Sequence, residues 1–295
     1  MGTTPEKTAN YFGPFTDTTR WDDFKHRPDD IFICTPPKCG TTWTQAICAM
    51  LVFGKVDHGH KPGIISPWID AQLAPIDEYL NQVESQKHRR FIKTHTPLDG
   101  IPYYPGCTYL VVVRDPRDVY LSALDHRDNM NNVELAFKVA PTSFEDWLTD
   151  EVDKETWDVQ SLSMLIHFFK SYWAFRDIPN IHIFHYADMK RDLKGSIATM
   201  AKALNIEVDE KFLDAMVEAA SFDNMKRNAS KFAPVGKTYW KQEAGFFAKG
   251  RNQQWKDLFT DTQLSEFNKQ LAKMLPLEQE ANWLLNGNNT AQQST

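Results

Sequence analysis

The chain has 295 residues, of which 42% are hydrophobic and 24% charged, and its formal net charge at pH 7 is −6. These values are typical of a globular protein, and the acidic balance argues against a basic surface that attracts nucleic acid. The longest apolar run, 46–53, is far shorter than the roughly 20 residues of a membrane span. We therefore expect no nucleic-acid or membrane partner, and any anion site must be local.

Four cysteines are present: Cys34, Cys39, Cys48 and Cys107. Their spacing fits neither a metal site nor a disulfide framework, so we expect free thiols in a reducing cytoplasm. The first residues lack the basic and apolar regions of a signal peptide. We expect one domain over 1–295, with an irregular segment at 1–23 and a frayed tail at 286–295.

The first predicted element is a short apolar strand at 31–34, followed by a Pro- and Gly-containing loop at 36–40 and an apolar helical pattern. A helix N-terminus after a strand and a tight loop attracts anions, and Lys38 adds a full positive charge. The standard nucleotide P-loop has its lysine after the second glycine, whereas here Lys38 precedes Gly40. A Pro-rich strand exit with a helix cap is the structural alternative.

Glycines and prolines predict a loop over 54–70, and a helix is expected over 71–83. A short strand at 91–92 leads into Lys93 and His95, which share one face of an extended chain because they are two residues apart. Ligands bind at the carboxyl ends of parallel strands in open α/β sheets, which favours a functional role for both residues. A solvated strand end is the alternative.

The clearest strand is 108–113, which is apolar on both faces like a central parallel strand. Arg114 follows at its end, where a core would exclude it, and a predicted helix carries Ser122. Arg114 is predicted either to reach a ligand or to pair with Asp115 or Asp118.

The rest of the chain alternates between helical patterns and one more strand. A polar loop and possible lid is expected at 128–142, a strand at 181–186, and helices at 143–152, 159–175, 193–204, 209–220, 260–275 and 278–285. Four strands that each precede a helical pattern predict a parallel sheet flanked by helices.

Six motifs between residues 24 and 256 together resemble the PAPS-dependent cytosolic sulfotransferase family, where PAPS is 3′-phosphoadenosine 5′-phosphosulfate. They are Pro37–Trp43, Lys93–Pro97, Val112–Ser122, Tyr186–Lys190, Ser221–Lys226 and Phe246–Lys256. The flank Phe24–Asp30 is also similar to that family. The resemblance implies a P-loop-like α/β fold.

The resemblance also implies the residues of the site. Lys38 and Lys93 would stabilise the transferring sulfuryl group, and His95 would accept the proton of the acceptor hydroxyl. The nucleotide would be held by Lys38, Cys39, Gly40, Thr41, Thr42, Trp43, Arg114, Ser122, Tyr186, Ser221, Phe222, Met225, Lys249, Gly250 and Arg251. No metal is expected.

Some of these roles have an ordinary structural alternative. Trp43 and Phe222 would stack on adenine, but Phe222 would equally suit a core, and Tyr186 a strand end. Trp68 either lines an acceptor pocket or anchors its own loop. His126 is a second candidate base without motif support.

Three positions depart from the family pattern. Ala220 replaces a threonine, and Ala248 replaces an arginine, a charge that we expect Arg251 to supply. Cys39 replaces a common serine, and we expect a reactive thiolate there because Lys38 and a helix N-terminus lie beside it.

The expected activity is in-line transfer of the sulfuryl group of PAPS to a hydroxyl of a small, largely apolar acceptor (phenol, sterol or alcohol), with PAP released. A P-loop kinase is disfavoured by the loop order, and a PAP-binding protein without catalysis by the presence of Lys93 and His95. The family's dimer motif is half present, since Lys256 and Thr260 match but Asp261 does not. A homodimer therefore stays open.

Overall fold

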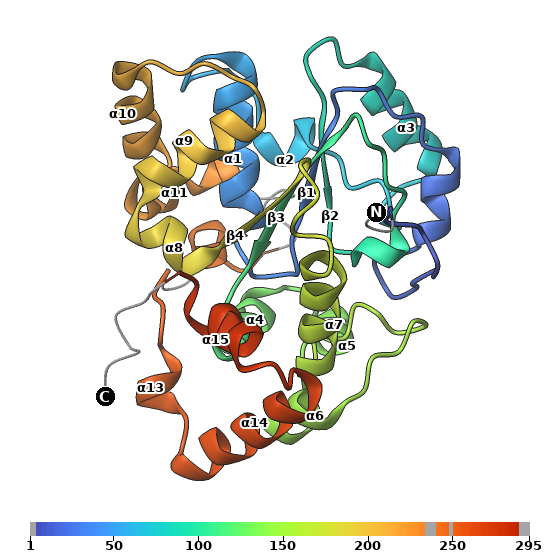
Figure 1. Ribbon diagram of the computed structural model, residues 1–295, viewed down its shortest axis with the longest axis vertical. Coiled ribbons are helices and arrows are strands. Elements are labelled where there is room, and N and C mark those ends of the chain that lie inside the picture. The colour runs from blue at the N-terminus through green and yellow to red at the C-terminus, as the bar shows by residue number, and fades with distance from the viewer. Residues whose placement is uncertain (1–3, 234–239, 248–249, 289–295) are drawn as a thin grey trace.

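The computed structural model describes residues 4–233, 240–247 and 250–288. Four parallel strands form one sheet in the order β2-β1-β3-β4, as Figure 1 shows. Their bounds are β1 (Ile31–Cys34), β2 (Phe91–Thr94), β3 (Thr108–Val113) and β4 (Ile181–His185). The predicted parallel sheet is confirmed, and the four strands lie where the apolar runs indicated.

Helices cover both faces of the sheet. In chain order they are η1 (Thr18–Asp23), α1 (Thr41–Phe53), α2 (Pro62–Ile65), α3 (Ile76–Ser85), η2 (Leu98–Gly100), α4 (Pro116–Asn129), α5 (Val133–Val139), α6 (Phe144–Thr149), α7 (Leu162–Trp173), α8 (Tyr186–Arg191), α9 (Leu193–Ala203), α10 (Glu210–Ala219), α11 (Phe222–Arg227), α12 (Ala229–Phe232), η3 (Glu243–Phe246), α13 (Trp255–Leu258), α14 (Asp261–Met274) and α15 (Glu278–Asn286). Most of the tail predicted to fray, 289–295, lies outside the described residues.

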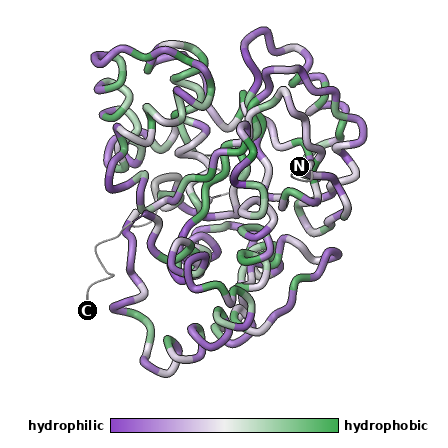
Figure 2. Tube along the Cα trace, viewed as in Figure 1, coloured by the Kyte–Doolittle hydropathy of each residue, from purple (hydrophilic) through white to green (hydrophobic). Residues whose placement is uncertain are grey.

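The two faces of the sheet have separate cores, because alternate residues of a strand point to opposite sides. Phe32, Tyr109 and Val111 pack with residues of α7 and α14 on one face. Ile33 and Leu110 pack with residues of α1, α9 and α10 on the other. The strands accordingly form a hydrophobic centre in Figure 2. The sheet is thus a rigid support for whatever its ends carry.

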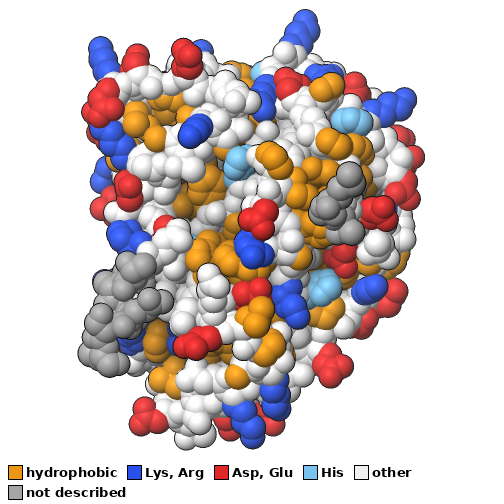
Figure 3. Space-filling view, viewed as in Figure 1, with side chains coloured by type: hydrophobic (Ala, Val, Ile, Leu, Met, Phe, Trp, Pro, Cys, Tyr) orange, Lys and Arg blue, Asp and Glu red, His pale blue; other side chains and the backbone are white. Residues whose placement is uncertain are grey.

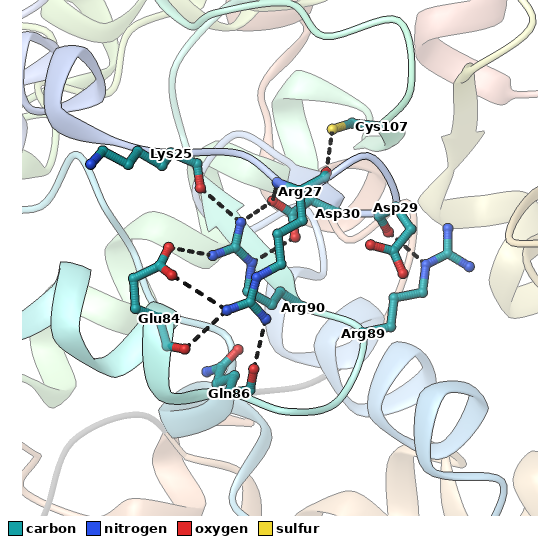
Figure 4. Close-up of polar contacts among 9 residues, drawn as sticks. All are labelled: Lys25, Arg27, Asp29, Asp30, Glu84, Gln86, Arg89, Arg90 and Cys107. Carbon is teal, nitrogen blue, oxygen red and sulfur yellow. Dashed lines mark hydrogen bonds and ion pairs between the residues drawn. The ribbon is translucent and has the colours of Figure 1, made fainter.

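The amino end of the sheet is closed by a buried charged cluster around Arg90, drawn in Figure 4. Arg90 and Asp30, which directly precede β2 and β1, have side chains that are 0% exposed. The Arg90 guanidinium donates from Nε to Asp30 Oδ1 at 2.7 Å, from Nη1 to Glu84 at 3.1 Å and from Nη2 to the Lys25 carbonyl at 2.9 Å. A buried ion pair is tolerated when its hydrogen bonds are satisfied, so this cluster holds the strand starts together.

The carboxyl end of the sheet is open by topology. The chain leaves β1 for β2 on one side, whereas β3 continues to β4 on the other. Loops that diverge from neighbouring parallel strands leave a crevice between them, which is where ligands bind in such sheets. The loops after β1 and β3 contain Lys38 and Arg114.

Helix α3 begins later than the predicted 71–83. Pro75 stands directly before its first turn, and Arg20 donates to the carbonyl oxygens of Ala71 and Ala74. Those carbonyl oxygens therefore accept hydrogen bonds from Arg20 and not from backbone N–H groups of a helix.

The loop predicted over 128–142 contains helix α5, so the prediction of a loop was wrong. The Asn132 side chain accepts the N–H of Leu135 and caps the helix. Ala136 is buried and packs against Met130 and Trp240. The capping residue and the apolar spacing were the available signals.

Candidate active site

A cavity of about 710 Å³ opens at the carboxyl ends of the strands. The segment that follows each strand contributes a side chain: Lys38 after β1, His95 after β2, Arg114 after β3 and Tyr186 after β4. The predicted site residues that line it are Lys38, Gly40, Thr41, Thr42, Trp43, Lys93, His95, Arg114, Ser122, Tyr186, Ser221, Phe222, Met225 and Gly250. The chain thus gathers segments spread over more than 200 residues into one site.

The loop between β1 and α1 has an unusual backbone. Lys38 has a φ of 68° and Gly40 a φ of 102°. The left-handed region costs roughly 1–2 kcal/mol for a residue with a Cβ, so Lys38 is held there by its surroundings. A Cβ at position 40 would lie 3.1 Å from the Tyr186 ring, which explains glycine there. The loop brings Lys38 to the start of α1.

Lys38 and Lys93 both line the cavity, and neither forms an ion pair with a carboxylate among the described residues. Lys38 Nζ lies 2.9 Å from His126 Nδ1, and burial together with the Arg114 charge lowers the pKa of Lys38 to about 7. Lys93 Nζ lies 4.3 Å from the centre of the Trp68 ring, and burial lowers the pKa of Lys93 to about 8. An anion in the cavity would raise both pKa values and hold both amines charged.

His95 has a defined tautomer. Its Nδ1 lies 2.6 Å from the carbonyl oxygen of Thr35, which can only accept, so Nδ1 carries the proton. Nε2 therefore has a free lone pair. Burial and the neighbouring Lys93 charge lower the pKa of His95 to about 3, which keeps the ring neutral. His126 accepts at Nδ1 when Lys38 donates, so its lone pair is engaged.

Arg114 crosses the cavity wall without a carboxylate partner of its own. It donates to the Arg251 carbonyl at 2.8 Å and the Lys38 carbonyl at 3.3 Å, and its buried Nε has no hydrogen-bond partner among the described residues. Asp115 pairs instead with Arg117 at 2.8 Å, and Asp118 accepts backbone N–H groups of 253 and 254. The predicted alternative, pairing of Arg114 with either aspartate, is not what the structure shows.

Aromatic rings form one end of the cavity. The Trp43 indole N–H donates to the Ala220 carbonyl at 2.8 Å, so this position needs no side-chain hydroxyl to orient the ring. Gly250 has a φ of 57°, and a Cβ there would lie 2.3 Å from the Phe222 ring. Glycine is therefore required where the backbone passes under Phe222.

Residues 28–277 match the sulfotransferase domain. This chain belongs to the sulfotransferase family. A glycolipid sulfotransferase of Mycobacterium bovis (strain BCG / Pasteur 1173P2) is 31% identical over 297 residues, with 90% of this chain and 91% of that protein covered. Human sulfotransferase 1C2 is 29% identical, with 83% of each chain covered. The family predicted from the motifs is confirmed.

Solved structures show the same fold. Mouse sulfotransferase SULT7A1 complexed with PAP has a TM-score of 0.71 at 21% identity, covering 90% of this chain and 91% of that one. Retinol dehydratase in complex with androsterone and inactive cofactor PAP has a TM-score of 0.66 at 20% identity, covering 88% and 86%. Among residues 4–233, 240–247 and 250–288 of this sulfotransferase, no helix is long and apolar enough to cross a membrane.

Cys39 is not placed as the sequence predicted. It is 1% exposed and does not line the cavity, and its N–H donates to the Pro36 carbonyl at 3.3 Å. Burial raises the pKa of its thiol to about 12, although Arg114 and Lys38 act in the opposite direction. The expected reactive thiolate is therefore wrong, because desolvation outweighs the nearby charges.

The cation expected from Arg251 is also missing from the cavity. Its side chain is exposed and does not line the wall, and only its carbonyl takes part, as the acceptor of Arg114. Lys190 lines the wall instead, and its amine donates to the Gly250 carbonyl. Lys249 and Ala248 lie outside the described residues.

The other end of the cavity escaped the sequence analysis, apart from Pro37, Trp68 and His126. It is lined by Phe15, Leu73, Tyr79, Met130, Val139, Asp158, Gln160, Trp240 and Phe246. These residues come from the N-terminal segment, from α3 and the loop before it, from α5 and its flanks, from the segment before α7 and from the segment around 246. No periodic pattern connects them, so sequence spacing could not have found them.

Proposed function

We propose that this sulfotransferase transfers the sulfuryl group of PAPS to a hydroxyl of a small, largely apolar acceptor, with His95 as the general base. The observation that carries the proposal is the free Nε2 lone pair of a neutral His95 in a cavity that Lys38 and Lys93 also line. His126 is the weaker candidate, since its Nδ1 faces Lys38.

The residues of the cavity fit PAPS. The Arg114 Nε without a partner, the glycine backbone under Phe222 and the aromatic rings suit a phosphorylated nucleotide. PAPS supplies the activated sulfuryl group when bound. Lys38 and Lys93 neutralise negative charge on that group, and the N-terminus of α1 with Thr41 and Thr42 binds the phosphate beside it.

Charge selects the 3′-phosphate. Arg114, Ser122 and Lys190 all line the cavity, and we assign Lys190, not Arg251, the charge of the family arginine replaced by Ala248. Burial and the Arg114 charge lower the pKa of Lys190, so an anion between the two cations would relieve their repulsion. Cys39 and Lys249 have no role assigned here.

The apolar end of the cavity receives the acceptor. Its wall contains Phe15, Met130, Trp240 and Phe246, which bury carbon and leave few polar groups to satisfy. His95 takes the proton of a hydroxyl placed between this wall and the lysines. We further propose that residues 1–295 act as one domain in the cytoplasm, where the four free cysteines stay reduced.

A panel of phenols, sterols and aliphatic alcohols incubated with isotope-labelled PAPS tests the activity, with product masses read by mass spectrometry. We expect a mass gain of one sulfuryl group on apolar alcohols or phenols, and PAP in equal amount. Absence of sulfated product across the panel, with PAP binding intact, would refute the acceptor class. In-line transfer predicts inversion at sulfur with chirally labelled PAPS.

A further inference from the structure

The acceptor end of the cavity contains an amide in a wall that is mostly apolar. Gln160 stands two residues before α7 and is 6% exposed. Its backbone N–H donates to the Val139 carbonyl at 3.3 Å, and both residues line the cavity. Gln160 is therefore fixed in the wall, next to α5.

The side chain of Gln160 forms no hydrogen bond with the residues that the structure describes. Its Oε1 is buried without a hydrogen bond, and the amide donates to no group among the described residues. Buried amides in folded proteins are almost always satisfied, so an exception in a binding cavity points to a ligand. An amide can both donate and accept, and it therefore suits a hydroxyl or a carbonyl.

Asp158, another polar group on this wall, already has hydrogen-bond partners. Its carboxylate accepts the Phe15 N–H at 2.6 Å, the Thr16 N–H at 2.9 Å and the Thr16 hydroxyl at 2.7 Å. These bonds tie the N-terminal segment to the wall. Gln160 is thus left to recognise an acceptor, together with the Trp68 indole N–H, which lines the same cavity and also has no hydrogen-bond partner among the described residues.

The position of Gln160 sets its distance from the chemistry. The Trp157 indole N–H donates to the His95 carbonyl at 3.3 Å, and Gln160 follows three residues later. Three residues span at most about 11 Å, which limits how far Gln160 can lie from the residue that contacts the His95 backbone. Apolar residues, among them Met130 and Val139, line the same end of the cavity.

We propose that Gln160 selects acceptors with a second polar group, a hydroxyl or a carbonyl, separated by an apolar body from the hydroxyl that is sulfated. This inference rests on the proposed function, since it assigns the far end of the same acceptor. Gln160 is a specificity residue and takes no part in the transfer. An acceptor without the second group leaves the amide unsatisfied and binds less well.

Straight-chain alcohols and their keto analogues test the inference. A ketone cannot itself be sulfated, so primary alcohols of six to twelve carbons with a carbonyl at successive positions measure where the amide reaches. We expect one carbonyl position to raise kcat/KM by roughly five-fold or more over the plain alcohol. The Kd of each alcohol for the PAP-bound protein, measured by calorimetry, should show the same preference.

The variant Gln160→Met keeps the length of the side chain and removes the amide, and it should abolish this preference while improving use of the plain alcohols. The exposed Gln279→Met on α15 is the matched control and should keep the preference. A preference that survives in Gln160→Met, or no carbonyl preference in the wild-type protein, would overturn the inference. A preference seen in Kd without any sulfated product would refute the proposed function and leave the role of Gln160 standing.

Discussion

The two ends of the sheet differ in the partners of their buried charged side chains. At the amino end, Arg90 and Asp30 are fully enclosed and the guanidinium also reaches Glu84. At the carboxyl end, Lys38 contacts an imidazole and Lys93 an indole ring. Elsewhere, charges of both signs mix on the face drawn in Figure 3. The same strands therefore begin in a satisfied ion cluster, and they end at lysines that form no ion pair with a carboxylate among the described residues.

This difference separates stability from function. Charge that is satisfied within the protein stabilises the fold and has nothing left to bind. A buried cation without a counter-charge lowers the stability of the free protein. An anionic ligand that pairs with such a cation removes this penalty, and its binding is correspondingly tighter. Substitutions at the amino end should therefore change unfolding, and substitutions at the carboxyl end should change binding and catalysis.

The largest effect is expected at the carboxyl end with His95→Ala. Loss of general-base assistance should lower kcat by about 10²–10⁴-fold, while PAP affinity, measured by calorimetry, stays close to wild type. His126→Ala should lose far less activity, because Nδ1 of that ring faces Lys38. A His95→Ala enzyme that keeps more than about a tenth of kcat contradicts the base assignment.

Arg90→Met breaks the amino end. It leaves the Asp30 carboxylate buried without its partner, which should cost about 3–5 kcal/mol in the free energy of unfolding measured with urea. The kcat of the remaining folded enzyme should not change. The double variant Asp30→Asn, Arg90→Met removes both charges and should recover part of the loss; if it is as unstable as Arg90→Met, the charge pair is not what holds this edge.

A change of pH should affect stability and PAP binding in opposite directions through Lys38 and Lys93. The pKa values of about 7 for Lys38 and about 8 for Lys93 lie below the ordinary lysine value, so the free protein binds fewer protons than the unfolded chain above pH 7. The contribution of these two lysines to the free energy of unfolding should therefore rise with pH. PAP, in contrast, requires the charged amines and should bind at least about ten-fold more weakly at pH 9 than at pH 7. Calorimetry that finds equal PAP affinity at both pH values would show that neither amine needs to take up a proton.

The smallest effect separates two cations near the nucleotide. Lys190→Met should weaken PAP binding by roughly ten-fold and adenosine 5′-phosphate binding much less, because the lost charge serves the 3′-phosphate. Arg251→Met is the matched control and should change neither, since that side chain does not line the cavity. If Arg251→Met weakens PAP binding and Lys190→Met does not, Arg251 is the residue that supplies the charge for the 3′-phosphate.

The strand pattern predicted much of the site. Lys38, Lys93, His95 and Arg114 follow apolar runs, and parallel strands bring their carboxyl ends together, so these residues could be placed before any coordinates. What failed depended on burial and on contacts between distant segments. Cys39 has a charged sequence neighbour but a buried thiol, and Arg251 is near Ala248 in sequence but turned away from the cavity. Gln160 belongs to no recognisable motif, and its proposed role follows from the apolar residues that line the cavity around it.

The hydrogen bond from His95 to the Thr35 carbonyl has a consequence for how this enzyme could diversify. Thr35 directly follows β1 and leads into the loop that presents Lys38, so one hydrogen bond ties the proposed proton acceptor to that loop. The acceptor wall is built from other segments, which carry Phe15, Val139 and Trp240. Mutations there can reshape the pocket while the reacting groups keep their alignment, so new acceptors are accessible without rebuilding the chemistry.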